Sequence, residues 1–360
     1  MENPVQVKDI NLEQIQPPYC LEIARAVVGD YMGNGARYMG AHFKSSRFNK
    51  AKFFLTGIVD ESSPNLYDPK AKLMVQGGTQ LGCSTRECDF CVYSNLPFYG
   101  NLEVQEIVDI FRASLFLYSK TRPMEKDERR LDLKFTDNGE PLESKNLTTA
   151  MSKLSNLFGQ EKKILEFKVS SIFRDLPMVK NNFDLLCRWQ NEYKDVASVH
   201  LQISRPFSGE QIMSYHEIRT VISNWNECNP KDTICISPGI LKGFDEAKMM
   251  EFLKELQDLR EHFFIRLAII KPSTDNQKKL LMPTEEIQRI HNEIANLSLD
   301  VRPLQSDTIY DNQLKGAGTL SHLPDGYIFD PNKYQPWEFA TSKRDPNLTK
   351  VFIIHNSGNF

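Results

Sequence analysis

The sequence predicts an α/β fold in which a parallel sheet curves into a partial (β/α)6 TIM-like barrel. From residue 72 onward, short runs rich in β-branched and aromatic residues alternate with longer segments whose apolar residues recur at helical spacing. The alternation passes through six βα units, too few for a complete eight-stranded barrel. Strands that alternate with helices pair in parallel through right-handed crossovers, so the six units predict one open, curved sheet.

The first unit begins with a strand over 72–76 and continues through a loop that contains three cysteines. A helix is expected from Leu102, because the apolar residues that follow recur at helical spacing. Thr284, which follows a proline and precedes Glu286, is typical of a helix start. The later strands are expected over 131–136, 164–170, 199–204, 233–240 and 263–270, and the later helices over 146–158, 180–193, 209–225, 245–259 and 284–296.

The chain divides into three predicted parts around this alternation. Residues 1–70 do not follow it and are expected to form an N-terminal cap, whereas residues 71–300 form the (β/α)6 core. Residues 301–360 are expected to close the barrel as a C-terminal extension, which begins with a further edge strand over 301–305. Sites on parallel sheets lie at the carboxyl ends of the strands, so the loops that follow the strands are where functional residues are expected.

Composition restricts the class of protein. Hydrophobic residues make up 40% of the chain and charged residues 25%, as in ordinary globular proteins. The apolar run over 263–270 is too short to cross a membrane, and the N-terminus lacks the pattern of a secretory signal. These features predict a cytoplasmic protein that has no membrane partner. A net charge of −3 gives no general basis for binding nucleic acid.

Three of the seven cysteines, Cys83, Cys88 and Cys91, lie within nine residues directly after the first predicted strand. An odd number of cysteines without a secretory signal argues against a disulfide framework, and the four scattered cysteines are expected to be small buried residues. Three thiolates can bind three irons of a [4Fe–4S] cluster and leave the fourth iron open. The alternatives are a structural zinc site, which normally takes four Cys or His ligands, and three unconnected buried cysteines.

The cysteine segment resembles the signature of the radical S-adenosylmethionine (SAM) superfamily, usually C-x3-C-x-aromatic-C. Phe90 stands at the aromatic position, which in that family packs near the adenine of SAM. This chain has one more residue between the first two cysteines, giving C-x4-C-x2-C. The resemblance implies a [4Fe–4S] cluster held by Cys83, Cys88 and Cys91, with SAM bound at its open iron.

The turn after the second predicted strand of the parallel sheet, Gly139 and Glu140, resembles the Gly-Gly-Glu motif of the same family. In the family this motif binds the methionyl amino group of SAM. An ammonium group needs hydrogen-bond acceptors, and such a turn supplies a carbonyl and a carboxylate at close approach. The alternative is an ordinary Asn-Gly turn that carries a solvated carboxylate.

Further SAM contacts are implied at the ends of the later strands, although any of these residues alone is more often an ordinary loop residue. Serine hydroxyls stand where the family holds the carboxylate or ribose of SAM, an arginine could pair with a carboxylate, and a lysine lies in a segment whose backbone borders the adenine. These residues are Ser170 and Ser171 after the third strand, Ser204 and Arg205 after the fourth, and Lys271 after the sixth.

Residues 73–316 most resemble the dual-specificity RNA adenine C2-methyltransferases and their C8-methylating relatives. The segments that carry this resemblance are 80–83, 139–142, 203–204, 271–272 and 313–316. That group uses two catalytic cysteines that this chain lacks. Gln76 stands at one of the two positions, and Tyr310 and Asp311 lie in the neighbourhood of the other. The methyl-carrier mechanism of the group is therefore not expected here.

The expected function is the reductive cleavage of SAM to a 5′-deoxyadenosyl radical, which abstracts hydrogen from a small-molecule or nucleotide substrate in biosynthesis. A reducing partner such as flavodoxin or ferredoxin is implied. Asp311, Tyr310 and Cys235 are the candidate catalytic residues at the substrate. One alternative is an RNA-modifying, methyltransferase-like enzyme, supported by the mixed cations and aromatics of 43–54. Another is a non-catalytic, metal-containing binding protein.

Overall fold

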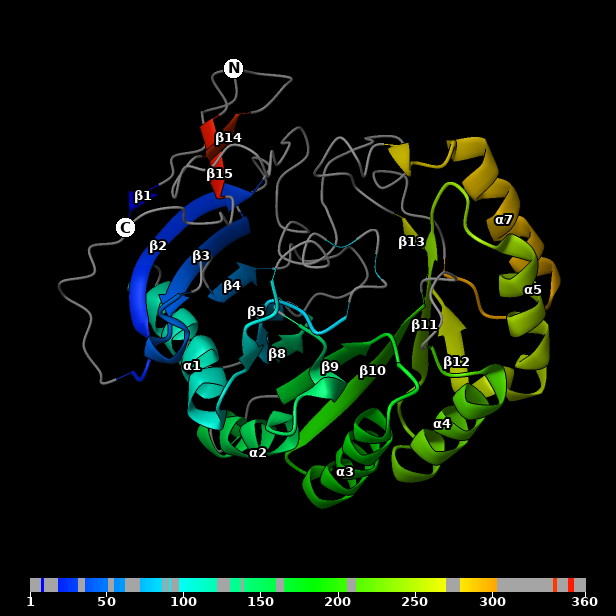
Figure 1. Cartoon of the computed structure of the whole chain (residues 1–360), viewed down its shortest axis with the longest axis horizontal. Helices are drawn as coiled ribbons and strands as arrows, with labels where there is room; N and C mark the ends of the chain where they lie inside the picture. Colours follow the sequence, from blue (N-terminus) through cyan, green and yellow to red (C-terminus); the bar gives the residue numbers. More distant parts are fainter. Residues whose placement is uncertain are drawn as a thin grey trace.

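The fold is built on one large mixed sheet. Eleven strands form this sheet, in which β1, β2, β3, β4, β5, β8, β9, β10, β11 and β12 follow in order and β13 pairs with β11 (Figure 1). The computed structural model describes residues 8–9, 19–31, 36–50, 55–61, 72–85, 88, 91, 97–121, 130–136, 139–159, 165–205, 212–269, 279–302, 339–341 and 349–352.

The predicted alternation of strands and helices is confirmed as a six-stranded parallel sheet. Each strand pairs in parallel with the next one along the chain, so the crossovers all run in the same direction. The protein is therefore a mixed α/β structure. The parallel strands are β5 (Lys72–Gly77), β8 (Arg130–Phe135), β9 (Leu165–Ser171), β10 (Ala197–Arg205), β11 (Ile234–Ile240) and β12 (Phe263–Ile265).

The helices between these strands lie along the outer side of the curved sheet (Figure 1). One well-capped example starts after Ser214, whose hydroxyl accepts from the Glu217 backbone while the Glu217 carboxylate accepts from Ser214. This reciprocal capping box satisfies backbone donors that a helix start leaves unpaired. The helices are α1 (Val104–Thr121), α2 (Leu147–Phe158), α3 (Pro177–Tyr193), α4 (Tyr215–Cys228), α5 (Glu246–Glu255) and α7 (Thr284–Asn296).

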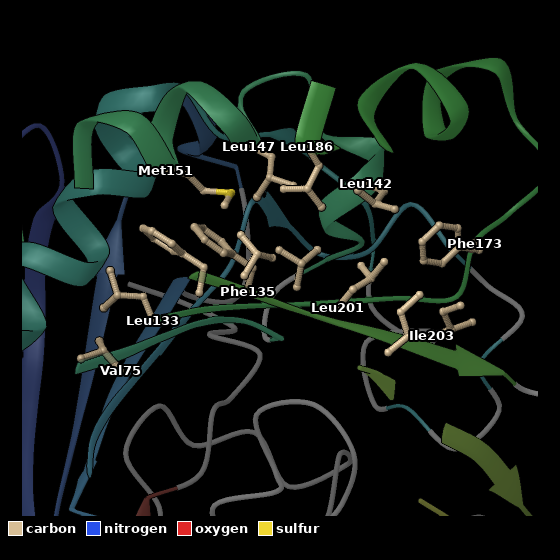
Figure 2. Close-up of a cluster of buried hydrophobic side chains, with 14 of the residues drawn as sticks. Val75, Leu133, Phe135, Leu142, Leu147, Met151, Phe173, Leu186, Leu201 and Ile203 are labelled. Atoms are coloured by element: carbon tan, nitrogen blue, oxygen red, sulfur yellow. The ribbon is translucent and has the colours of Figure 1, made fainter. Parts of the chain in front are cut away.

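The apolar core fills the space between the parallel strands and these helices (Figure 2). Alternate residues of a strand point to opposite faces, so Leu133 and Phe135 of β8 point toward the helices. Phe135 packs edge-on against Phe111 of α1 at 5.0 Å and stacks on Phe167 of β9 at 6.1 Å between ring centroids. The other face of these strands lies on the concave side of the sheet and carries mostly polar residues, as described below.

The N-terminal region forms strands of the same sheet. Strand β4 pairs with β5 in antiparallel register, with Ile58 opposite Gln76, and so joins the N-terminal strands to the parallel strands. Helix α1 covers both parts, because Phe43 and Val59 belong to the same buried core as Phe111. The strands are β1 (Lys8–Asp9), β2 (Glu22–Tyr31), β3 (Ala36–Lys44) and β4 (Leu55–Glu61).

Several element boundaries differ from the prediction. The sixth strand is interrupted, because Arg266 and Leu267 separate β12 from β13 (Ala268–Ile269). The helix expected over 245–259 ends at Glu255 and is followed by a 3-10 helix, η6 (Gln257–His262), and the helix expected from 209 begins at Tyr215.

The C-terminal extension is described only in part. Val301 makes an isolated parallel bridge with Ile265, and the rest of the edge strand expected over 301–305 lies outside the described residues from 303 onward. Two short antiparallel strands are described further on, β14 (Phe339–Thr341) and β15 (Thr349–Phe352). Among the helices that the structure describes, none is both long and apolar enough to cross a membrane.

A Gly57→Ala substitution tests the packing of strand β4 against helix α1. A Cβ atom at this position of β4 would overlap the Ser114 hydroxyl of α1 and crowd Phe43. We expect the free energy of unfolding to fall by about 1–3 kcal/mol, as for other overpacked cores. Urea unfolding followed by circular dichroism measures this loss.

Ser114→Ala is the matched second change for this test. Within the described residues the buried Ser114 hydroxyl has no hydrogen-bond partner, so its removal alone is expected to cost less than about 1 kcal/mol. The double variant should recover part of the stability lost in Gly57→Ala. Strictly additive losses would contradict the contact between β4 and α1.

Candidate functional site

Gln80 joins the cysteine loop to the Gly139–Glu140 turn. Its side-chain oxygen accepts hydrogen bonds from the backbone nitrogen and hydroxyl of Ser84, at 3.2 and 3.1 Å, and from the backbone nitrogen of Glu140, at 3.0 Å. Its side-chain nitrogen donates to Asn101 Oδ1 at 2.9 Å. Gln80 lies on β6 (Gln80–Leu81), which pairs with β7 (Gly100–Asn101), and is fully buried. One amide therefore fixes two loops that follow neighbouring parallel strands.

The three candidate cysteines lie in the loop after β5. Cys83 and Cys88 are buried and Cys91 is half-buried. The backbone nitrogen of Cys91 donates to the carbonyl of Cys88 at 2.8 Å, so these two residues share one turn. Burial raises the pKa of the Cys83 thiol, and the nearby Cys91 thiol raises it further. Cys83 is therefore a neutral thiol in the chain alone, and a metal ion would have to displace its proton.

The three cysteines do not form a ready-made site for one metal ion in the described residues. Among the described residues, no three His, Cys, Asp or Glu side chains are gathered closely enough to hold one metal ion, so the three cysteines do not form a preassembled zinc site. Thiolates that bind different irons of a cubane lie farther apart than ligands of one ion, because the irons and sulfides lie between them. Cys83 and Cys91 are near enough for the Cys91 thiol to raise the pKa of Cys83.

Glu140 is a buried carboxyl at the centre of the turn after β8. Its two oxygens accept from the backbone nitrogens of Leu142 and Ile172, at 3.3 and 3.1 Å, and Ser171 also hydrogen-bonds to it. Burial raises the pKa of Glu140 to about 7, although these hydrogen bonds oppose the rise. A carboxylate has about four acceptor positions, so acceptor capacity remains for a cationic ligand.

Gly139 lets the backbone of the turn approach Gln80. Its φ angle of 103° is one that residues with a side chain rarely adopt, and a Cβ atom here would overlap the Gln80 side chain. Gly139 is therefore packed directly against Gln80. Glu140 is only 4% exposed, so the alternative of a solvated carboxylate is wrong.

The two serines at the end of β9 point to opposite faces of the sheet. Ser170 lies on the concave side, where its hydroxyl is 2.9 Å from the Ser204 hydroxyl of β10. Ser204 also accepts from Gln202 Nε2 at 3.0 Å. Ser171 lies on the helix side and contacts Glu140. The structure thus brings Ser170 together with Ser204, and Ser171 together with Glu140.

Arg205 does not join the Ser170–Ser204 pair. It is the next residue after Ser204, so its side chain points to the helix face, where it donates to the carbonyl of Met213 at 2.8 Å. The guanidinium group lies 4.4 Å from the ring centroid of Phe252 on α5, and burial lowers its pKa to about 10. In the described residues it makes contacts typical of a structural arginine.

The candidate catalytic residues are only partly described. Cys235 of β11 is buried on the concave side, as the register pairing of Gln202 with Cys235 indicates. The prediction that all scattered cysteines are buried is wrong for Cys20, which is exposed, and Cys187 and Cys228 are half-buried. Tyr310, Asp311, Phe90 and Lys271 lie outside the described residues.

Two structural features around the site have no local signal in the sequence. The first is the role of Gln80, whose partner Glu140 is 60 residues away, so no local pattern could indicate it. The second is the buried ion pair between Arg174 and Glu143, with nitrogen–oxygen distances of 2.6 and 3.0 Å. This pair joins the turn after β8 to the loop after β9.

The comparisons with known proteins add no relative. A scan of protein-family models and a search of curated proteins both find no match to this chain.

A Gly139→Ala substitution tests the close approach between the turn and Gln80. We expect a loss of at least about 2 kcal/mol in unfolding free energy, because a strained backbone angle and a steric overlap act together. Gly243→Ala is the matched control: its φ is 86°, but no atom lies within 4 Å of the added Cβ. Chemical denaturation should show a loss of only about 1 kcal/mol there. Equal losses would contradict the packing of Gly139 on Gln80.

The raised pKa of Glu140 predicts a pH dependence of stability. The Glu140 carboxyl binds a proton more tightly in the folded chain than in the unfolded chain, where its pKa is 4.5. The stabilisation is fully present below pH 4.5 and is lost as the pH rises to about 7, by up to about 3 kcal/mol. Urea unfolding at about pH 5 and about pH 7.5 measures it.

Two variants isolate the contribution of Glu140. The loss with rising pH should be absent in Glu140→Gln, which cannot ionise. It should persist in Glu261→Gln, where the replaced carboxyl is exposed. If Glu140→Gln and the wild type have parallel pH profiles, the assignment of the raised pKa to Glu140 is wrong.

Proposed function

We propose that this chain is a radical SAM enzyme that binds a [4Fe–4S] cluster through Cys83, Cys88 and Cys91. The cluster and SAM together would supply a 5′-deoxyadenosyl radical that abstracts hydrogen from a small-molecule or nucleotide substrate. We also propose that the six-stranded parallel sheet and its helices form a partial (β/α)6 barrel. It also includes a reducing partner protein such as flavodoxin or ferredoxin.

The observation that carries the proposal is the bridge made by Gln80. Resemblance alone assigns Cys83 to a cluster and Glu140 to SAM, from segments far apart in the sequence. In the fold, both segments follow neighbouring strands and share hydrogen bonds to one side chain. The cluster ligands and the protein carboxylate that binds SAM have to lie close together, because SAM contacts both. The contact of both segments with one side chain supports the joint assignment.

The remaining residues of the site would each hold a part of the cofactor. Glu140 would accept from the amino group of SAM, and its ionised form would be favoured by that positive charge. The hydroxyls of Ser170 and Ser204 lie together on the concave side and would hydrogen-bond to the ribose or carboxylate. Gly139 would keep the turn against Gln80, which in turn would keep Glu140 beside the cysteine loop.

The RNA-modifying alternative has less support from the described residues. Phe43 is fully buried in the core, and Phe48 packs against it. Arg47 pairs with Glu106 at 2.6 Å and with Glu103 at 3.3 Å. These aromatics and this cation are therefore engaged within the protein, whereas base stacking requires accessible rings. We favour a small-molecule or nucleotide substrate for this reason.

A Cys88→Ala substitution tests the ligand set. After anaerobic reconstitution with iron and sulfide, the wild type should show the visible absorbance of thiolate–iron charge transfer, and Cys88→Ala should lose most of it. Cys228→Ala is the matched control, because this half-buried cysteine of α4 has no proposed role in the ligand set. It should retain the full absorbance and iron content. Full absorbance in Cys88→Ala would remove Cys88 from the ligand set.

The reconstituted wild type, reduced by dithionite in the presence of SAM, should then release 5′-deoxyadenosine. A full cluster without this product would instead favour the non-catalytic, metal-containing alternative.

A further inference from the structure

The concave face of the parallel sheet carries an unusual group of positive charges. Lys134 of β8 and Lys168 of β9 occupy directly paired positions in neighbouring strands, so their side chains leave the same face side by side. Arg266, in the interruption between β12 and β13, lies near enough to influence the charge of Lys168. We call Lys134, Lys168 and Arg266 the cation group.

Two carboxylates stand near the cation group. Asp132 and Glu166 stand one layer below the two lysines on the same strands. Glu166 is bound by His200 Nε2 at 2.7 Å, and His200 also contacts Asp232 through its other ring nitrogen. Asp132 favours the charge of Lys168, but less than the neighbouring cations oppose it.

Lys168 is the member of the group with the least compensation. Within the described part of the chain its ammonium makes no hydrogen bond and no ion pair, although its side chain is still partly accessible. Burial lowers the pKa of Lys168 well below its usual value, and Arg266 and Lys134 lower it further. Like charges on directly opposed strand positions destabilise a sheet. Such an arrangement is unfavourable in the free protein and becomes favourable when an anion neutralises it.

Hydrogen bonds connect the cation group to the serine pair. Arg266 donates to Gln202 Oε1 at 3.1 Å, and Gln202 Nε2 donates to Ser204, which contacts Ser170. Ser170 follows Lys168 by two residues on the same face of β9, a rise of roughly 7 Å. Lys134 and Lys168 therefore lie one layer deeper in the concave side than the two serine hydroxyls, and Arg266 lies at the level of the serines.

We propose that the cation group binds the carboxylate or phosphate group of a small-molecule substrate, which extends from there toward the serine pair. The identification of this ligand as a substrate depends on the proposed function, but the anion site itself does not. The position between neighbouring strands, one layer below the strand ends, fits a single terminal anionic group of a small molecule. The group of the substrate that reacts would then lie near Ser170 and Ser204.

The test measures anion binding to the full chain purified without cluster or SAM. Inorganic phosphate and succinate, each titrated against chloride at constant ionic strength, should raise the unfolding temperature of the wild type. The anion that gives the larger rise identifies the group as phosphate or carboxylate. In Lys168→Met the apparent dissociation constant should increase about tenfold or more, the effect of losing one charge-assisted hydrogen bond.

Lys180→Met is the matched control, because Lys180 is an exposed lysine of α3 paired with Asp175 and Glu217. It removes the same charge and should leave anion binding unchanged. Without anions, Lys168→Met should unfold at the same temperature as the wild type or higher, because a repelled, poorly solvated charge is removed. A lower unfolding temperature would indicate that Lys168 has a structural role, and would overturn the proposal.

Two further outcomes would also overturn it. One is no stabilisation of the wild type by either anion, and the other is equal stabilisation of the wild type and Lys168→Met. If SAM competes with the anion for this site, the cation group would be assigned to the cofactor instead of the substrate. Because these measurements need no radical chemistry, failure to release 5′-deoxyadenosine would leave their result intact. Failure of anion binding would in turn leave the cluster assignment intact.

Discussion

The two-residue alternation of the parallel strands is the constraint on which both the core and the candidate site depend. On β8, Leu131, Leu133 and Phe135 face the helices and are buried, whereas Asp132 and Lys134 face the concave side. A shift of one residue in strand register would exchange the two sets and place charges against the helices. The apolar core therefore fixes the register, and the register places the polar residues together on the concave side.

Within that frame, Gln80 determines how the loops at the strand ends sit relative to each other. Loops at the ends of parallel strands have few regular hydrogen bonds of their own, so buried backbone groups in them need side-chain partners. Gln80 supplies one acceptor to both Ser84 and the backbone of Glu140. The arrangement requires Gly139, because any Cβ there would occupy the space of the amide. The buried Gln80 side chain thus fixes the position of the cysteine loop relative to the Gly139–Glu140 turn.

Much of the parallel sheet could be predicted from the sequence, because each strand and helix has its own local periodicity. The N-terminal strands β2, β3 and β4 were missed as part of the sheet, since their partners are set by pairing with β5 and packing on α1. Ser170 and Ser171 were expected to act together, but neighbouring strand residues face opposite sides. Local patterns could likewise not predict that Lys134 and Lys168 are paired, because only the register of β8 and β9 reveals it.

The cation group is easier to understand as a feature retained for binding than as one that stabilises the fold. Like charges at directly opposed strand positions destabilise a sheet, and proteins retain unfavourable groups chiefly where activity requires them. Under the proposed function, such a group would fix one end of the substrate on rigid strands. The hydrogen-bonded series from Arg266 through Gln202 to Ser204 would then set the distance between that end and the cofactor. Because selectivity in hydrogen abstraction comes from positioning, the sheet itself would determine which hydrogen is removed.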